Sequence, residues 1–260
     1  MLKPRWMLAA LVAGLLGGCG GGNLGGNSTS QPLPDLQGRA VTVAVETSAP
    51  PFSYVDIGGN GSGWDYDTVQ EICRRLNCNP RFQQTPFQGV FDAVHAGQFD
   101  MLADGVTVTS ARQQLVSFST SYATINEVLL VRVGELESLD LFKVDATKVV
   151  GAQAGTTNAQ TAIDTFGAAR VVTAATEPQV VSALLTGTLD GAVLDNIVAN
   201  TFARGNPGLL ETLGGLTGSE NLAFAFPLNS TLLAPVNSAL QSMMNDGTLR
   251  MLNVKWGVAS

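Results

Sequence analysis

The sequence predicts an α/β fold with largely parallel sheets, on the basis of three observations. Hydrophobic residues make up 45% of the chain and charged residues 13%, which is typical of a globular protein. Short apolar segments at 41–45, 101–103 and 191–194 have the length of buried strands. Residues with helical periodicity follow these segments, and strands that alternate with helices are typical of α/β proteins.

The elements of the first half follow in order from these patterns. After the strand at 41–45, apolar residues at 69, 72 and 76 recur at helical spacing, and Asp65 or Asp67 is placed to cap that helix. Apolar residues at 90, 91 and 94 predict a second helix that ends at Gly97. The strand Met101–Ala103 comes next.

The second half repeats the alternation. Val149-Val150 and the segment 191–194 are predicted strands, each followed by a helix, and the second of these helices should end near Phe202. Apolar residues at 236, 240 and 243 line one face of a C-terminal helix, which Gly247 should cap.

The N-terminus has the pattern of an export signal. A basic start (Lys3, Arg5) precedes the apolar run Met7–Leu16, which is shorter than the roughly 20 residues that a membrane span needs. Small residues then precede Cys19, as in the bacterial lipoprotein signal, whose cysteine is lipid-modified and becomes the first mature residue. We therefore expect a signal peptide at 1–18 and a lipid anchor on Cys19 at the membrane; an ordinary cleaved signal is the alternative.

A tether and an acidic domain are expected after the signal. Residues 19–38 are rich in Gly, Ser, Asn and Pro and have no hydrophobic period, which is typical of a flexible linker. Removal of 1–18 leaves 12 basic against 21 acidic residues, a net charge of −9. Such a charge disfavours binding to nucleic acid and to anionic lipid headgroups.

Two cysteines remain in the mature domain. Export places Cys73 and Cys78 where disulfides can form, but five residues apart on one helix their Cα atoms would exceed the limit of about 7 Å. Asn77 could end the helix in a left-handed turn and fold Cys78 back. The sequence therefore allows two alternatives, a disulfide or two free thiols. The spacing of the cysteines fits neither a zinc site nor a redox pair.

Polar clusters directly follow four of the predicted strands. They are Glu46-Thr47-Ser48, Asp104 to Arg112, Gly155-Thr156-Thr157, and Asp195. In open α/β sheets ligands bind at the carboxyl ends of the strands, at a crossover, so these clusters are the candidate site.

Seven segments, in a fixed order, have a familiar pattern. They are Val43–Phe52, Gly63–Asp67, Phe99–Arg112, Phe118–Tyr122, Gly155–Thr157, Gly187–Asp195 and Val236–Trp256. Together they resemble the polar amino-acid-binding proteins (family 3) of bacterial ABC importers, which are type II periplasmic solute-binding proteins. The resemblance spans about 39–257.

The resemblance implies a two-lobed fold with a ligand cleft between the lobes and two crossover strands. We place the crossings near Val131 and Phe226, with lobe 1 at 39–131 and 227–260 and lobe 2 at 132–226. The implied function is capture of an amino acid for an ABC transporter permease, with lobe closure around the ligand. The implied protein is a monomer that needs no cofactor or metal.

The resemblance assigns the ligand's carboxylate to Arg112, whose guanidinium can make two parallel hydrogen bonds. Thr107 and Thr157 would add hydroxyl and backbone donors, and a helix start after Thr156 favours an anion. A solvated Arg112 is the alternative, and Thr156 and Thr157 could simply cap a helix.

The ammonium of the ligand would bind Asp195, with the carbonyl of Gly105 as a second acceptor. From the sequence pattern alone, Asp195 could equally be a helix N-cap.

The ligand's side chain would meet Phe87, Glu46 and Asp104. Ala49 stands where the family commonly has an aromatic residue, which argues against a ligand stacked between aromatic rings. Two carboxylates that face one buried pocket repel unless a cation joins them, so we expect arginine, lysine or histidine as ligand. Alternatively, Asp104 turns outward or caps a turn, and the ligand is a neutral polar amino acid such as glutamine.

An enzyme is the rival class, because a dehydratase offshoot shares this fold. His95, the only histidine, lies on a predicted helix away from the strand ends, and the sequence holds no catalytic triad, metal-ligand cluster or phosphate loop. We therefore expect no catalytic residues. A sensory domain is a third possibility, which binding data alone would not separate from an importer subunit.

Overall fold

The computed structural model describes residues 32–135 and 138–258. The expected signal peptide at 1–18, the lipid site Cys19 and most of the tether lie outside the described residues. From Leu33 onward the chain forms one compact unit. Within the described ranges, no helix is both long and apolar enough to cross a membrane.

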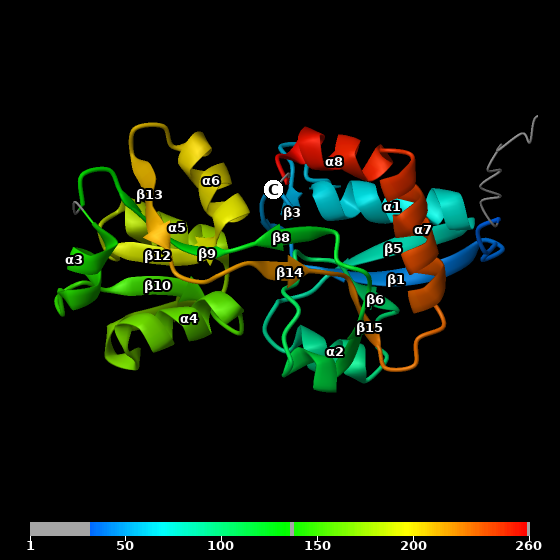
Figure 1. Ribbon diagram of the computed structural model, residues 1–260, viewed down its shortest axis with the longest axis horizontal. Coiled ribbons are helices and arrows are strands. Elements are labelled where there is room, and N and C mark those ends of the chain that lie inside the picture. The colour runs from blue at the N-terminus through cyan, green and yellow to red at the C-terminus, as the bar shows by residue number, and fades with distance from the viewer. Residues whose placement is uncertain (1–31, 136–137, 259–260) are drawn as a thin grey trace, which may run out of the picture. The chain divides into compact units, whose positions relative to one another are not determined.

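The first lobe is built on a five-stranded mixed sheet in the order β5-β1-β6-β15-β7 (Figure 1). Strand β1 pairs in parallel with β5 and β6, whereas β15 is antiparallel to both of its neighbours. The strands are β1 (Arg39–Val45), β5 (Cys78–Gln84), β6 (Met101–Leu102), β7 (Val116–Phe118) and β15 (Ala225–Pro227). A small sheet, formed by β2 (Ser48–Ala49), β3 (Ser53–Val55) and β4 (Gly61–Ser62), follows β1.

The second lobe repeats this plan with the order β11-β10-β12-β9-β13. Strand β10 is parallel to β11 and β12, and β9 is antiparallel to β12 and β13. The strands are β9 (Glu127–Arg132), β10 (Val150–Gln153), β11 (Val171–Ala174), β12 (Gly191–Asp195) and β13 (Leu210–Gly215).

Two further strands connect the lobes. β8 (Ala123–Ile125) and β14 (Glu220–Leu222) pair antiparallel, and the chain leaves the first sheet through β8 and returns through β14 (Figure 1). The crossings expected near Val131 and Phe226 correspond to positions inside β9 and β15, just beyond this pair. Residues 128–131 belong to the second sheet because each of them pairs with β12.

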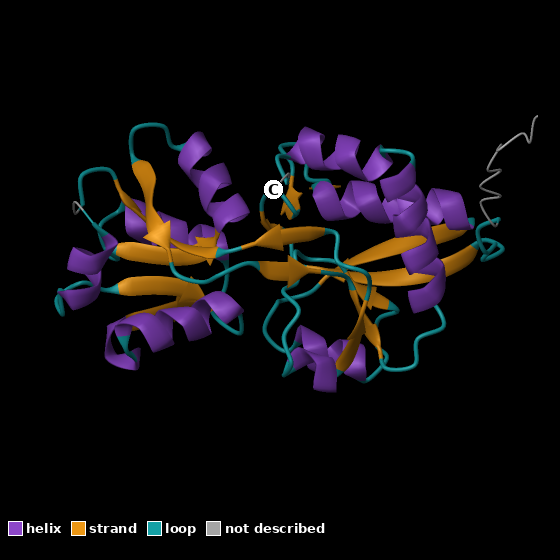
Figure 2. Cartoon of the chain, in the orientation of Figure 1, coloured by secondary structure: helices purple, strands orange, loops and turns teal. Residues whose placement is uncertain are grey.

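Helices cover both faces of each sheet (Figure 2). In the first lobe, α1 packs against the valines of β1, whereas α2 packs against Ala44 on the opposite face. Successive side chains of a strand point to opposite faces, which explains why one strand serves both layers. The helices are α1 (Trp64–Leu76), α2 (Val90–His95), α3 (Leu139–Val144), α4 (Thr157–Phe166), α5 (Glu177–Leu185), α6 (Asn196–Gly205), α7 (Leu233–Asn245) and α8 (Thr248–Trp256).

The start of α1 differs from the prediction. Neither Asp65 nor Asp67 caps it, because the helix begins after Gly63 and both aspartates lie within its first turn. The Asp67 carboxylate instead accepts hydrogen bonds from Lys255 Nζ and Trp256 Nε1, each at 2.7 Å. This contact fastens α8, at the C-terminus, to α1.

The end of α1 holds a disulfide. Asn77 adopts the left-handed conformation (φ 52°), and Cys73 and Cys78 are bonded with their Cα atoms 4.5 Å apart. The left-handed residue is what brings the two cysteines within bonding distance, as the sequence suggested it could.

Other helix ends agree with the sequence to within a few residues. Gly97, at φ 74°, follows α2 and its C-cap Ala96. Gly247, at φ 81°, follows the C-cap Asp246 of α7. Helix α6 continues to Gly205, three residues past the predicted end at Phe202.

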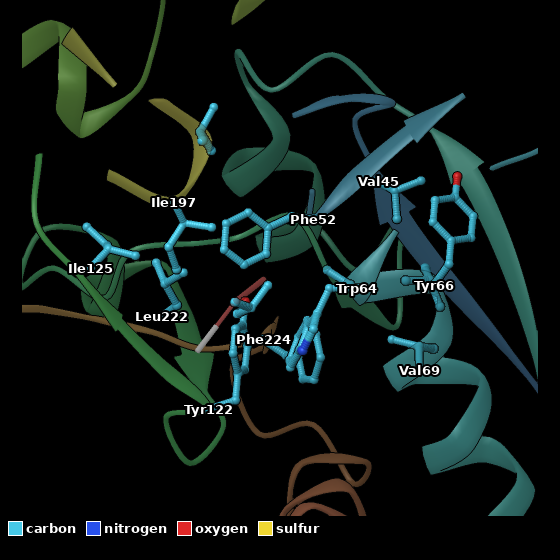
Figure 3. Close-up of a cluster of buried hydrophobic side chains, with 14 of the residues drawn as sticks. Val45, Phe52, Trp64, Tyr66, Val69, Tyr122, Ile125, Ile197, Leu222 and Phe224 are labelled. Carbon is cyan, nitrogen blue, oxygen red and sulfur yellow. The ribbon is translucent and has the colours of Figure 1, made fainter. Parts of the chain in front are cut away.

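An aromatic cluster packs beside the connecting strands (Figure 3). Trp64 is fully buried, and its ring centroid lies 4.3 Å from that of Tyr122 and 5.9 Å from that of Phe224. Ile125 of β8 and Leu222 of β14 belong to the same core. The first lobe and the connecting strands therefore share one apolar core. Burial of each large apolar side chain in this core stabilises the fold by about 1.5–3 kcal/mol.

Candidate ligand-binding cleft

A cleft lies between the lobes and is lined by residues of both. All nine residues predicted from the sequence to contact the ligand line it: Glu46, Phe87, Asp104, Gly105, Thr107, Arg112, Thr156, Thr157 and Asp195. Segments far apart in the chain thus meet at one place, as expected for the carboxyl ends of strands in α/β sheets.

The turn after β6 depends on a glycine. Gly105 has φ 56°, and a Cβ at this position would lie 3.0 Å from the ring of Phe52. Its N–H donates to Oδ2 of the fully buried Asp65 at 3.1 Å. Asp65 therefore fixes the turn that carries Asp104 and Gly105 into the cleft.

Arg112 begins the short 3-10 helix η1 (Arg112–Gln114) and is half-buried, not a solvated surface residue. Its Nη1 donates to the Thr107 carbonyl at 2.8 Å, and its Cζ lies 4.5 Å from the ring centroid of Phe91 and 5.5 Å from that of Phe87. Within 32–135 and 138–258, Arg112 has no ion pair. Burial lowers the pKa of Arg112 to about 10, so the group stays charged and can receive an anion.

The second lobe presents the start of a helix to the same cleft. Thr156 is the N-cap of α4: its Oγ1 accepts from Ala159 N at 3.1 Å and donates to Gln153 O at 2.7 Å. Thr156 and Thr157 also line the cleft, so capping and a place at the site coincide. The N-terminus of α4 carries a partial positive charge that favours a carboxylate.

Asp195 occupies the N-cap position of α6 but makes no side-chain capping bond. It is 7% exposed, and its Oδ1 has no hydrogen-bond partner in the part of the chain that the structure describes. Burial raises the pKa of Asp195 to about 7, with a further rise from the neighbouring Glu127. A buried acceptor without a partner is chemically suited to a ligand ammonium.

Glu46 and Asp104 lie together in the cleft, each 6% exposed. The Ser53 hydroxyl lies between them, within hydrogen-bonding distance of the Glu46 backbone carbonyl and, at 2.5 Å, of Asp104 Oδ1. Asp104 is therefore directed inward, and the alternative of an outward side chain is wrong. Burial raises the pKa of both carboxyls, and repulsion from Glu46 adds to the rise at Asp104.

Two polar residues that sequence reasoning missed complete this side of the cleft. Gln153, the last residue of β10, donates from Nε2 to Glu46 Oε2 at 2.7 Å and to the Ala175 carbonyl at 3.0 Å. Glu177, the first residue of α5, is 5% exposed, and its Oε2 has no partner among the described residues.

The signals for these residues were weak but present. Gln153 ends strand β10 and Glu177 comes shortly after β11, so both lie near strand ends of the second sheet. However, β11, which precedes Glu177, is partly or fully exposed along its length and was not predicted as a strand. Phe52, Asn158 and Val198 also line the cleft and were not predicted to do so.

The described residues offer no arrangement of three or more His, Cys, Asp and Glu side chains that could hold a metal ion. His95 is exposed at the end of α2, where its Nδ1 lies 2.7 Å from the Leu115 carbonyl, and it does not line the cleft. Arg112 and the buried acids that line the cleft suit a small zwitterion with both a carboxylate and an ammonium.

Comparison with known proteins agrees with this geometry. The family model of the bacterial extracellular solute-binding proteins, family 3, matches residues 41–259. The chain belongs to this family. The resemblance inferred from the ordered motifs and the two-lobed fold are both confirmed.

Individual family 3 relatives are distant in sequence but match over most of their length. The probable histidine-binding protein of Neisseria gonorrhoeae is 28% identical over 211 residues, 80% of this chain and 77% of that protein. The L-cystine-binding protein TcyJ of Escherichia coli (strain K12) is 25% identical over 215 residues, 82% of this chain and 81% of that protein. The solved arginine-, lysine-, histidine-binding protein ArtJ of Geobacillus stearothermophilus has a TM-score of 0.78 and 27% identity, covering 84% of this chain and 95% of that one.

Proposed function

We propose that this family 3 protein is the exported substrate-binding subunit of an amino-acid importer and captures arginine, lysine or histidine by lobe closure. One observation carries the proposal. Among the described residues, the cleft is lined by four acids, Glu46, Asp104, Glu177 and Asp195, and by a single cationic side chain, Arg112.

Two of these charges match the groups common to all amino acids. Arg112 and the N-terminus of α4 would bind the ligand's carboxylate, with Thr107 and Thr157 adding donors. Asp195 would bind the ammonium, and the Gly105 carbonyl would be a second acceptor. The zwitterionic part of a ligand thus uses one positive and one negative group.

Three acids then remain for the ligand's side chain. Glu46, Asp104 and Glu177 are each at most 6% exposed, so water solvates them poorly. A neutral or acidic side chain would leave them without a counter-charge, whereas a cationic side chain compensates them. Ala49 lines the cleft without an aromatic ring, which also argues for charge over stacking as the basis of recognition.

Names of relatives support the ligand class in part. Histidine and the set arginine, lysine and histidine are named for two of the relatives described above. Cystine is named for the third, so cystine belongs among the compounds to be tested.

Anchoring and delivery complete the proposal. A lipid on Cys19 would tether the protein at the membrane, beside the permease that receives the ligand. Incorporation of labelled fatty acid that is lost in a Cys19→Ala variant would support the anchor, and equal incorporation in both would refute it.

The experiment that tests the ligand class is calorimetry of the purified protein with the common amino acids and cystine. Ligand at about 100 times its Kd should raise the free energy of unfolding by about 2.7 kcal/mol, so thermal shifts give the same ranking. Arginine, lysine or histidine should bind most tightly and be recovered unchanged. Tightest binding of glutamate, aspartate or a neutral amino acid would refute the cationic ligand, and chemical conversion of the ligand would refute a pure binding role.

A further inference from the structure

The formation of helix α5 does not explain why the side chain of Glu177 is buried. Its helix α5 is already well started, because Gln179 Oε1 accepts from Ala175 N at 3.1 Å and from Thr176 N at 3.3 Å. An acid in the first turn favours a helix equally well from an exposed position. Glu177 is nevertheless 5% exposed, and its Oε2 has no hydrogen-bond partner in residues 32–135 and 138–258. Such an arrangement costs free energy unless another group binds the carboxylate.

The surroundings of Glu177 indicate which kind of group would bind its carboxylate. Gln153 links Glu46 of the first lobe to the carbonyl of Ala175, two residues before Glu177. The Glu177 carboxyl lines the same cleft as Glu46 and Asp104 but comes from the other lobe. All four acids line this one cleft, and repulsion from Asp195, Glu46 and Asp104 adds to burial in raising the pKa of Glu177.

We propose that Glu177 is a specificity-determining residue that binds the cationic end of the ligand's side chain from the second lobe, facing Glu46 and Asp104 of the first. The inference rests on the proposed function and adds a residue to it. A guanidinium carries five N–H donors around its plane and an ammonium carries three, so either can bind carboxylates on more than one side.

The position of Glu177 on the second lobe has a consequence for selectivity. Lobe closure around a cationic side chain would gain the contact with Glu177, whereas closure around a neutral side chain would bury an uncompensated acid. Because a ligand shifts a conformational equilibrium only by its differential affinity for the two states, Glu177 makes the closed state specific for a cation.

The test uses Glu177→Gln, which keeps the shape and removes the charge, and two pairs of ligands that differ in side-chain charge. These are arginine with citrulline and lysine with norleucine. The matched control is Glu211→Gln, on β13 of the same lobe, where the side chain is exposed and accepts from Gly134 N. The control corrects for the general change in net charge.

The expected result is a loss of about ten- to a hundredfold in affinity for the tighter-binding cation, with the affinity for its neutral partner changed less than about threefold. Glu211→Gln should change neither. Equal loss for both members of a pair, or no loss for either, would overturn the role of Glu177. Unfolding midpoints of both variants show whether the fold is retained, and Glu177→Ala, with the same paired ligands, replaces Glu177→Gln if that variant fails to fold.

The same measurements distinguish failure of the proposed ligand class from failure of the proposed role of Glu177. If wild-type protein itself does not prefer the cation to its neutral partner, the cationic ligand class is wrong and the role of Glu177 falls with it. If wild type prefers the cation and Glu177→Gln preserves that preference, only the role of Glu177 is wrong.

Discussion

Affinity for arginine or lysine should fall steeply as the pH is lowered from 8 to 5. The reason is Asp195, whose carboxyl must be ionised to bind the ligand's ammonium. Burial raises its pKa to about 7, so the ligand-free site is largely ionised at pH 8 and largely protonated at pH 5.

The magnitude follows from that pKa. With a pKa of about 7, about 90% of Asp195 is ionised at pH 8 and about 1% at pH 5, which corresponds to an affinity loss of about a hundredfold. Burial also raises the pKa of Glu46, Asp104 and Glu177. A cationic ligand that ionises these groups should therefore show an even steeper loss.

Isothermal titration calorimetry at several pH values, in buffers of different ionisation enthalpy, measures both the affinity and the protons released on binding. Arginine and lysine are the suitable ligands because their own groups do not titrate between pH 5 and 8, whereas histidine does. Asp195→Asn should bind weakly at pH 8 and, at pH 6 and below, release about one proton fewer than wild type. Asp164→Asn, which removes an exposed carboxylate of the same lobe, should behave as wild type. Wild-type affinity that is constant from pH 8 to 5 would refute the reasoning.

Two further predictions concern Arg112, which would bind the ligand's carboxylate, and the stability of the ligand-free protein. Arg112→Ala should weaken binding of every amino acid by at least about a hundredfold, since it removes the common carboxylate anchor, and Arg112→Lys should be intermediate; unchanged calorimetric affinity would contradict this. The free energy of unfolding of ligand-free protein should fall by about 2 kcal/mol between pH 5 and 7, because folded Asp195 still holds a proton that the unfolded chain, with a pKa near 3.8, has released. Urea unfolding at each pH measures this free energy, and saturating arginine should reverse the trend. If the free energy of unfolding of ligand-free protein instead rises with pH, the raised pKa of the buried acids is contradicted.

Much of the candidate site followed from local sequence patterns. Each of Glu46, Asp104 and Asp195 comes at or just after the end of a buried strand, and strand ends can be recognised from apolar runs a few residues long. Strand geometry predicted that these side chains lie at ligand-binding strand ends, and the family resemblance implied that they share one cleft between two lobes.

Features that depend on long-range packing were not accessible in this way. Glu177 was missed because β11, the short and partly exposed strand that precedes it, was not predicted as a strand. Asp65 was expected to cap α1 from its position in the chain, yet its carboxylate binds Gly105 N, forty residues away. Neither partner can be read from nearby residues.

The sequence by itself therefore determined the α/β class, the family and nine residues of the cleft, because these depend on local periodicity and on motifs in a given order. Only the tertiary structure decided which charges are buried, which are paired and which lobe carries the third acid of the side-chain pocket. Burial and pairing are properties of atoms brought together from distant parts of the chain, and they set the pKa of Asp195 and the counter-charge that the cleft requires.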